Sequence, residues 1–137
     1  LRLNMGAAMA RLAAVSYEET GIDAGTHRFD ATQLIETVGD IVLARRDIGT
    51  SYHIAVVVDD AAQGITEVTR GQDLYAATAI HVVLKRLLGL PTPAYHHHRL
   101  IRDDQGKRLA KRDDARALSK YRAEGATPAD IRRMVGL

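Results

Sequence analysis

Apolar residues follow a strand-like period in some stretches of the chain and a helix-like period in others. The run Ile65–Arg70 has the period of a strand. Residues 76–88 carry apolar side chains three and four positions apart and end before Gly89 and Pro91, which predicts a helix. A strand over 95–102 follows. Strands and helices in turn predict an α/β fold with a largely parallel sheet.

Shorter elements are expected on both sides of this central part. The pattern before it predicts strands over 1–4, 15–20, 26–30 and 40–47, the last one buried. It also predicts a helix over 5–14 and a short helix or turn over 31–37. The pattern after it predicts two short helices, over 115–123 and 128–135. The second has Thr127 in the cap position and Pro128 as its first residue, a typical helix start.

The stretch 50–64 is ambiguous between strand and helix. Its centre, Val56–Val58, is β-branched and favours a strand. Thr50 or Ser51 before it and Gly64 after it are typical helix boundaries and favour a helix. Both alternatives remain open on the pattern alone.

Composition and charge narrow the class of protein. No apolar run among the 137 residues approaches the roughly 20 that a spanning helix needs, so we expect no membrane protein. The chain has no Cys, which excludes disulfides and thiolate metal sites and fits a cytoplasmic protein. Residues 1–98 hold 8 Lys and Arg against 11 Asp and Glu, whereas residues 99–137 hold 11 against 6. The basic end favours a polyanion partner or is an ordinary Arg-rich surface.

The densest basic run lies between Asp103-Asp104 and Asp113-Asp114. It contains Lys107, Arg108, Lys111 and Arg112 and follows a predicted strand. Lys is a flexible point charge and Arg a planar fork, so this loop suits phosphate oxygens. A solvated surface loop is the alternative.

A second candidate site lies at the end of the predicted strand 65–70. Arg70, with Asp73 and Tyr52, has the donors to clamp an amino acid, because Arg binds a carboxylate through two parallel hydrogen bonds. A surface ion pair beside a half-buried Tyr is the alternative. The run His96–His98 is a weak metal candidate, since at most the first and last imidazoles share a face of a strand.

Several motifs in order resemble one family. Gly106–Arg112 resembles the KMSKS signature loop of class I aminoacyl-tRNA synthetases, with Arg108 for its first lysine and Ala110 for its serine. The run Asp59-Asp60-Ala61-Ala62-Gln63-Gly64-Ile65-Thr66, followed by Arg70-Gly71-Gln72-Asp73-Leu74, resembles the glutamyl branch. Gln63 and Asp73-Leu74 are most similar to the glutamyl-Q tRNA(Asp) synthetases within that branch.

The resemblance implies a fold, an activity and site residues. The fold would be the C-terminal part of a Rossmann-like catalytic domain, and the activity would join glutamate, activated with ATP and its Mg counter-ion, to the queuosine of tRNA(Asp). Tyr52 and Arg70 would bind glutamate. Lys111 would be catalytic and bind ATP, and Arg108, His97 and Asp73 would line the ATP side. No metal ligand is expected within the chain, because the family's zinc-binding segment and HIGH motif would precede Leu1.

The chain is therefore expected to be a single fragment of a catalytic domain, inactive alone and monomeric. Residues 1–39 would be a connecting region of the catalytic domain. Residues 40–112 would form the second half of the nucleotide-binding fold with its signature loop, and residues 113–137 a short helical end. Three alternatives stay open: part of a glutamyl-tRNA synthetase charging tRNA(Glu), a non-catalytic RNA-binding piece, or a structural piece without a ligand.

Overall fold

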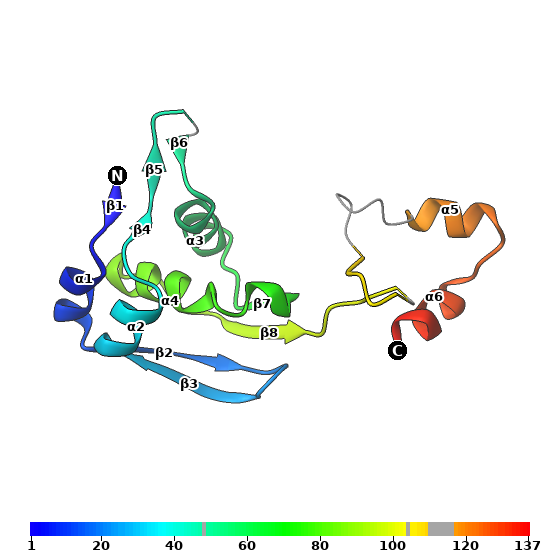
Figure 1. Ribbon diagram of the computed structural model, residues 1–137, viewed down its shortest axis with the longest axis horizontal. Coiled ribbons are helices and arrows are strands. Elements are labelled where there is room, and N and C mark those ends of the chain that lie inside the picture. The colour runs from blue at the N-terminus through cyan, green and yellow to red at the C-terminus, as the bar shows by residue number, and fades with distance from the viewer. Residues whose placement is uncertain (48, 104, 110–116) are drawn as a thin grey trace. The chain divides into compact units, whose positions relative to one another are not determined.

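The computed structural model describes residues 1–47, 49–103, 105–109 and 117–137. The chain forms two compact units, Leu1–Arg99 and Leu100–Leu137, which are described one at a time (Figure 1).

The first unit is built on a four-stranded sheet with the order β3-β2-β8-β7. Its strands are β2 (Ala14–Glu19), β3 (Gly25–Asp30), β7 (Glu67–Gly71) and β8 (Ala94–His98). β8 is parallel to both β2 and β7, whereas β3 is antiparallel to β2. The carboxyl ends of β2, β7 and β8 therefore meet at one edge of the sheet. The predicted α/β fold with a mostly parallel sheet is confirmed.

Helices cover this sheet and bury its apolar side chains. α4 (Thr78–Leu87) lies between the sheet and α3 (Tyr52–Ala62), and α1 (Met5–Leu12) and α2 (Ala31–Thr37) pack nearby (Figure 1). The buried apolar core gathers residues from these helices and from three strands: Met5, Ala8, Met9, Val15, Tyr17, Leu34, Ile41, Val57, Ala79, Val82, Val83, Leu84 and Tyr95.

The ambiguous stretch 50–64 forms the helix α3. It begins after Ser51 and is followed by Gly64, whose φ of 66° is the left-handed conformation that suits glycine after a helix. The helix boundaries thus outweigh the β-branched centre. Val57 is completely buried in this helix, so tertiary packing supports the same outcome.

Three predicted boundaries were wrong. The stretch 40–47 is no single buried strand: β4 (Ile41–Val42) pairs with β1 (Arg2–Leu3), and β5 (Ala44–Arg45) pairs with β6 (Gly49–Thr50). Only Ile41 is buried there, while the polar residues 45–47 are exposed. The strand over 95–102 ends at His98, and a 3-10 turn, η1 (Gln72–Leu74), precedes the helix that was expected from residue 76.

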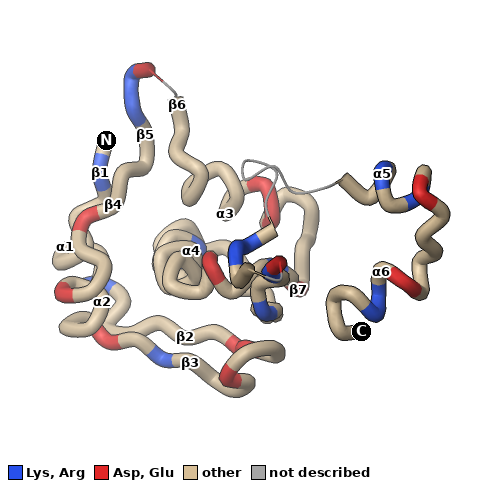
Figure 2. The backbone as a smooth tube through the Cα atoms, turned by 45° about the vertical axis from the view of Figure 1, so that its right-hand side comes forward, with Lys and Arg blue, Asp and Glu red and all other residues tan. Residues whose placement is uncertain are grey.

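The second unit is small and helical at its end. Arg102 and Arg108 form an isolated antiparallel bridge, and α5 (Leu118–Ala123) and α6 (Pro128–Val135) follow. Thr127 and Asp130 cap α6 reciprocally, as the sequence predicted for this helix start. Figure 2 shows basic residues on both helices, with the acidic Asp130 among them on α6. Within the described ranges, the chain has no helix with the length and apolarity to cross a membrane.

Candidate functional site

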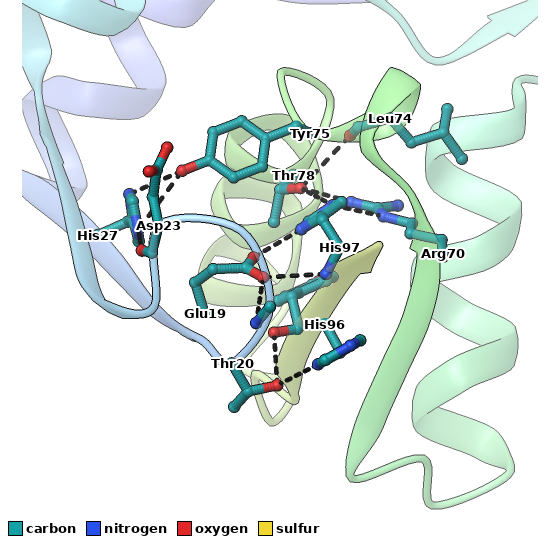
Figure 3. A network of polar contacts seen from close by, with 12 residues as sticks. Glu19, Thr20, Asp23, His27, Arg70, Leu74, Tyr75, Thr78, His96 and His97 are labelled. Carbon is teal, nitrogen blue, oxygen red and sulfur yellow. Dashed lines mark hydrogen bonds and ion pairs between the residues drawn. The ribbon is translucent and has the colours of Figure 1, made fainter. Parts of the chain in front are cut away.

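Arg70 lies at the carboxyl end of β7 and is held by three neighbours, two of which, Thr78 and His97, are shown in Figure 3. Its Nε donates to Nε2 of His97 at 3.1 Å, one terminal nitrogen contacts Nδ1 of His81 at 3.1 Å, and the other donates to Oγ1 of Thr78 at 2.6 Å. The guanidinium carbon also lies 5.1 Å from the centre of the Tyr95 ring, where a cation is attracted by the aromatic face. The side chain is therefore fixed in position and plane.

Two of these partners come from one face of α4. Thr78 and His81 are three residues apart, so a helix places them side by side, and Lys85 continues the same stripe four residues later. All three are almost fully buried. Lys85 points to the backbone oxygen of Val57 at 3.4 Å and to Asp60 at 3.7 Å. This polar stripe gives the arginine hydrogen-bond acceptors inside an otherwise apolar interface.

The third partner, His97, is backed by a buried carboxylate. Glu19 at the end of β2 is 2% exposed, and its Oε1 accepts hydrogen bonds from the backbone N–H groups of His97 and Gly21, both at 2.9 Å. Its Oε2 lies 2.6 Å from Nδ1 of His97. Arg70 and His97 are direct neighbours across the β7–β8 pair. The row Glu19–His97–Arg70 thus crosses three strands of the sheet (Figure 3).

Gly21 allows the end of β2 to approach β8 closely. A Cβ atom at this position would lie 2.3 Å from the backbone oxygen of His97 and 2.8 Å from its nitrogen. A Cβ atom does not lie this close to nonbonded backbone atoms in proteins, so only glycine permits this approach. The same approach delivers the Gly21 N–H to Glu19.

The hydrogen bonds of Arg70 determine where the imidazole protons are. Arginine only donates, so Nε2 of His97 and Nδ1 of His81 must be acceptors. His97 therefore carries its proton on Nδ1 and donates it to Glu19. His81 carries its proton on Nε2 and donates it to Nδ1 of His53, 3.0 Å away. Both rings are neutral in this arrangement.

Burial and charge support the neutral state of His81 and the ionised state of Glu19. Burial, with Arg70 nearby, lowers the pKa of His81 to about 3, and the same two causes lower the pKa of His53. Burial alone would raise the pKa of Glu19. The hydrogen bonds from His97 and Gly21 outweigh burial and keep that pKa below its usual value. The site is thus a fixed cation beside neutral rings and one shielded carboxylate.

Tyr52, the other residue predicted to bind glutamate, converges with Arg70 on His81. It is the first residue of α3, its side chain is 52% exposed, and its ring centre lies 5.7 Å from that of His81. Three of the five N–H donors of Arg70 serve described residues, which leaves two for a ligand. An exposed tyrosine and a fixed guanidinium that contact the same histidine suit a small carboxylate.

Asp73 and His97 were predicted to line the ATP side. Asp73 is exposed in η1, at the same edge of the sheet, and borders a hollow of about 290 Å³ with Ile22, Asp23, Gln72, Tyr75 and Ala76. Tyr75 from this group contacts Nδ1 of His27 at 3.1 Å. His97 is buried, with both ring nitrogens engaged. Their role toward ATP stays a prediction.

The predicted phosphate-binding residues belong to the second unit. Arg108 is half-buried and takes part in the bridge with Arg102. Lys111, the predicted catalytic residue, lies outside the described residues. Both roles stay predictions.

Sequence reasoning missed Glu19, Thr78 and His81. The last two leave a trace in the sequence, because polar residues at 78, 81 and 85 repeat with helical spacing inside an apolar helix. Glu19 shares the face of Val15 and Tyr17 by strand alternation, but its partner His97 is 78 residues away and leaves no local cue.

The His96–His98 run alternates as expected for a strand. His97 points into the core, while His98 is exposed and His96 lies half-buried, with Nδ1 3.0 Å from Oγ1 of Thr20. Over the parts of the chain that the structure describes, no three His, Asp or Glu side chains are grouped to hold a metal ion.

Comparisons with known proteins agree with this architecture. Residues 25–137 match the family profile of the class I tRNA synthetases (E and Q), catalytic domain. Over its whole length the chain is 65% identical to a glutamyl-Q tRNA(Asp) synthetase of Rhodobacter capsulatus, of which it covers 49%. A glutamyl-Q tRNA(Asp) synthetase of Nocardia farcinica is 48% identical over 69% of the chain and 30% of its own length.

A solved structure shows the same fold. The crystal structure of glutamate-tRNA synthetase from Elizabethkingia anophelis superposes with a TM-score of 0.58 at 29% identity, covering 73% of this chain and 19% of that one. The chain spans about half the length of the Rhodobacter relative. Since the family profile matches most of its length and its sheet has the fold of that family, the chain belongs to the class I tRNA synthetases for glutamate and glutamine, as part of their catalytic domain.

Proposed function

We propose that this chain forms the C-terminal half of the active site of a glutamyl-Q tRNA(Asp) synthetase. The reaction activates glutamate with ATP, which enters with Mg²⁺ as its counter-ion, and transfers glutamate to the queuosine of tRNA(Asp). The observation that carries the proposal is Arg70, whose guanidinium is fixed by Thr78, His81 and His97 with two donors left for a carboxylate. The 65% identity to a protein of that name supports the choice of substrate.

The first step needs placement more than acid–base chemistry. A carboxylate oxygen of glutamate attacks the α-phosphorus of ATP, and the bond from that phosphorus to the pyrophosphate oxygen breaks. Arg70 and Tyr52 would hold glutamate in line with this bond. Lys111 would neutralise the charge that develops on the leaving pyrophosphate, with Arg108 beside it in sequence and Asp73 and His97 on the ATP side.

Because the chain covers 49% of the Rhodobacter relative, joining it to the rest of that relative tests the proposal. We expect the 137 residues alone to be inactive. Fusing them to the part of the Rhodobacter capsulatus relative that lies outside the match should produce a completed protein with glutamate-dependent exchange of pyrophosphate into ATP. A completed protein that exchanges pyrophosphate equally well with glutamine, or with no amino acid, would contradict the proposal.

The second half-reaction separates the two synthetase readings. The completed protein should load glutamate onto tRNA(Asp) that contains queuosine and leave tRNA(Asp) without queuosine unloaded. Loading of tRNA(Glu) instead would identify a glutamyl-tRNA synthetase. Tight, salt-sensitive RNA binding without any response to glutamate or ATP would favour the RNA-binding alternative.

A further inference from the structure

The orientation of the Arg70 side chain depends on which nitrogen of the His97 ring carries the proton. Nε2 of His97 can accept from Arg70 only while the ring proton is on Nδ1. A neutral imidazole in water carries its proton on either nitrogen, so something in the fold must select one form. Glu19, 2.6 Å from Nδ1, is the group in contact with that side of the ring.

We propose that Glu19 is a positioning residue for the arginine of the site. Its carboxylate holds the His97 proton on Nδ1, which turns the Nε2 lone pair toward Arg70 and fixes the plane in which the guanidinium meets a carboxylate ligand. The first part of this proposal, that Glu19 keeps the His97 proton on Nδ1, depends only on contacts within this chain. Its effect on ligand use rests on the proposed function, in which the ligand is glutamate.

The geometry requires a carboxylate at position 19. One oxygen already accepts two backbone N–H groups, from Gly21 and His97, so it must be an acceptor. In Glu19→Gln the amide oxygen therefore takes this place and the NH₂ group faces Nδ1 of His97. That ring nitrogen must then accept, and the ring proton moves to Nε2.

The displaced proton creates a conflict at the arginine. Nε2–H of His97 would point at Nε–H of Arg70, and two donors cannot bond. His97 is 1% exposed, so water does not reach this nitrogen. Oγ1 of Thr78, 3.2 Å from Nε2, can accept the displaced proton, but that contact does not restore the bond between His97 and Arg70. Arg70 would lose one of its three anchors while Thr78 and His81 stay in place.

Nitrogen NMR of the histidine rings tests the selection directly. In the 137-residue chain labelled with ¹⁵N-histidine, His97 should show a protonated Nδ1 and an unprotonated Nε2, and Glu19→Gln should exchange the two. The signal is assigned by its loss in His97→Gln. Glu18→Gln is the matched control, because Glu18 is the exposed neighbour that bonds Thr26 instead. A wild-type ring protonated on Nε2, or a Glu19→Gln ring unchanged, would overturn the proposal.

Kinetics of the completed protein test the consequence for the ligand. Glu19→Gln should raise the KM for glutamate roughly 10-fold, the cost of one lost buried bond to a charged group, and change the KM for ATP less than about 2-fold. In the His97→Gln background the amide oxygen accepts from Arg70 in either case. Glu19→Gln should then have a much smaller effect.

The outcomes separate this inference from the proposed function. A wild-type completed protein that ignores glutamate refutes the proposed function, whereas the NMR result still decides the ring form. An exchanged ring form with an unchanged KM for glutamate refutes the positioning role. If Glu19→Gln does not fold, the wild-type ring form and the KM of His97→Gln, expected within a few-fold of wild type, decide the question.

Discussion

The two units of the chain hold their cations in opposite ways. In Leu1–Arg99 the guanidinium of Arg70 is anchored by three side chains, two of them backed by further partners. Every buried residue among those described lies in this unit. In Leu100–Leu137, Arg133 pairs with Asp130 one helical turn away, and Arg102 donates to the backbone oxygen of Gly106 four residues on.

The difference follows from what each unit can bury. A core can place a neutral histidine such as His81 against an arginine, because burial and the arginine's charge both disfavour a second proton on the ring. The described part of the small unit buries no side chain, so Arg102 and Arg133 meet their partners at exposed positions close in sequence. A fixed fork suits a single carboxylate, whereas clustered cations suit the several oxygens of a polyphosphate.

The largest expected effect tests whether the cations of the second unit are interchangeable. In the completed protein, Lys111→Ala should lower kcat roughly 10²–10³-fold, as loss of one preorganised donor at a developing charge does. Lys107→Ala, at an exposed residue of the same basic run, should cost far less. Rapid-quench measurement of adenylate formation compares them, and similar losses would leave only a generic basic patch.

The next effect concerns the neutral histidines of the first unit. The pKa of His81 is about 3 in the folded chain and near 6.5 in an unfolded one, so the unfolded state takes up the proton first as pH falls. The contribution of the neutral His81 ring to the free energy of unfolding is therefore full above about pH 6.5 and decreases progressively toward pH 3. By pH 4 the loss should be on the order of 3 kcal/mol.

Urea unfolding between pH 7 and pH 4 measures this loss. His81→Asn keeps an acceptor for Arg70 and cannot titrate, so its stability should fall less steeply than that of the wild type. His98→Asn, at an exposed ring, is the control and should follow the wild type. Parallel pH profiles for all three proteins would show that His81 is not held neutral.

The smallest effect tests whether Arg70 acts on glutamate or on the fold. Arg70→Ala removes a charge-assisted partner of the carboxylate worth about 1.5–3 kcal/mol, so the KM for glutamate should rise about 10- to 150-fold. The KM for ATP should change much less. Arg86→Ala, at an exposed arginine in the last turn of α4, is the control. Equal rises for glutamate and ATP would mean that Arg70 is structural.

Much of the fold was predictable because its cues are local. The helix before Gly89, the strand before Arg70 and the cap at Thr127 each depend on residues a few positions apart, and each was found. The stretch 40–47 was not, because its apolar centre resembles a buried strand while its partners, β1 and β6, lie on different sides of it in sequence.

The site was predictable only in part for a similar reason. The place of Arg70 at a strand end follows from the local pattern, and its ligand role came from a resemblance. The surroundings of that arginine depend on pairing between β2, β7 and β8, which joins residues that are far apart in the chain. Strand alternation separates Glu19, on the face of Val15 and Tyr17, from Glu18 on the other face, but nothing local in the sequence shows that Glu19 meets His97.

The close approach at Gly21 limits how this protein can vary. Adding a single methyl group there would push the backbone of β8 away, because its carbon would overlap the carbonyl of His97. The carboxylate of Glu19 would then lose the two N–H groups that orient it, although no side chain of the site had changed. A mutational scan should find position 21 as intolerant as Arg70 itself, so the residue with no side chain shares the arginine's selective constraint.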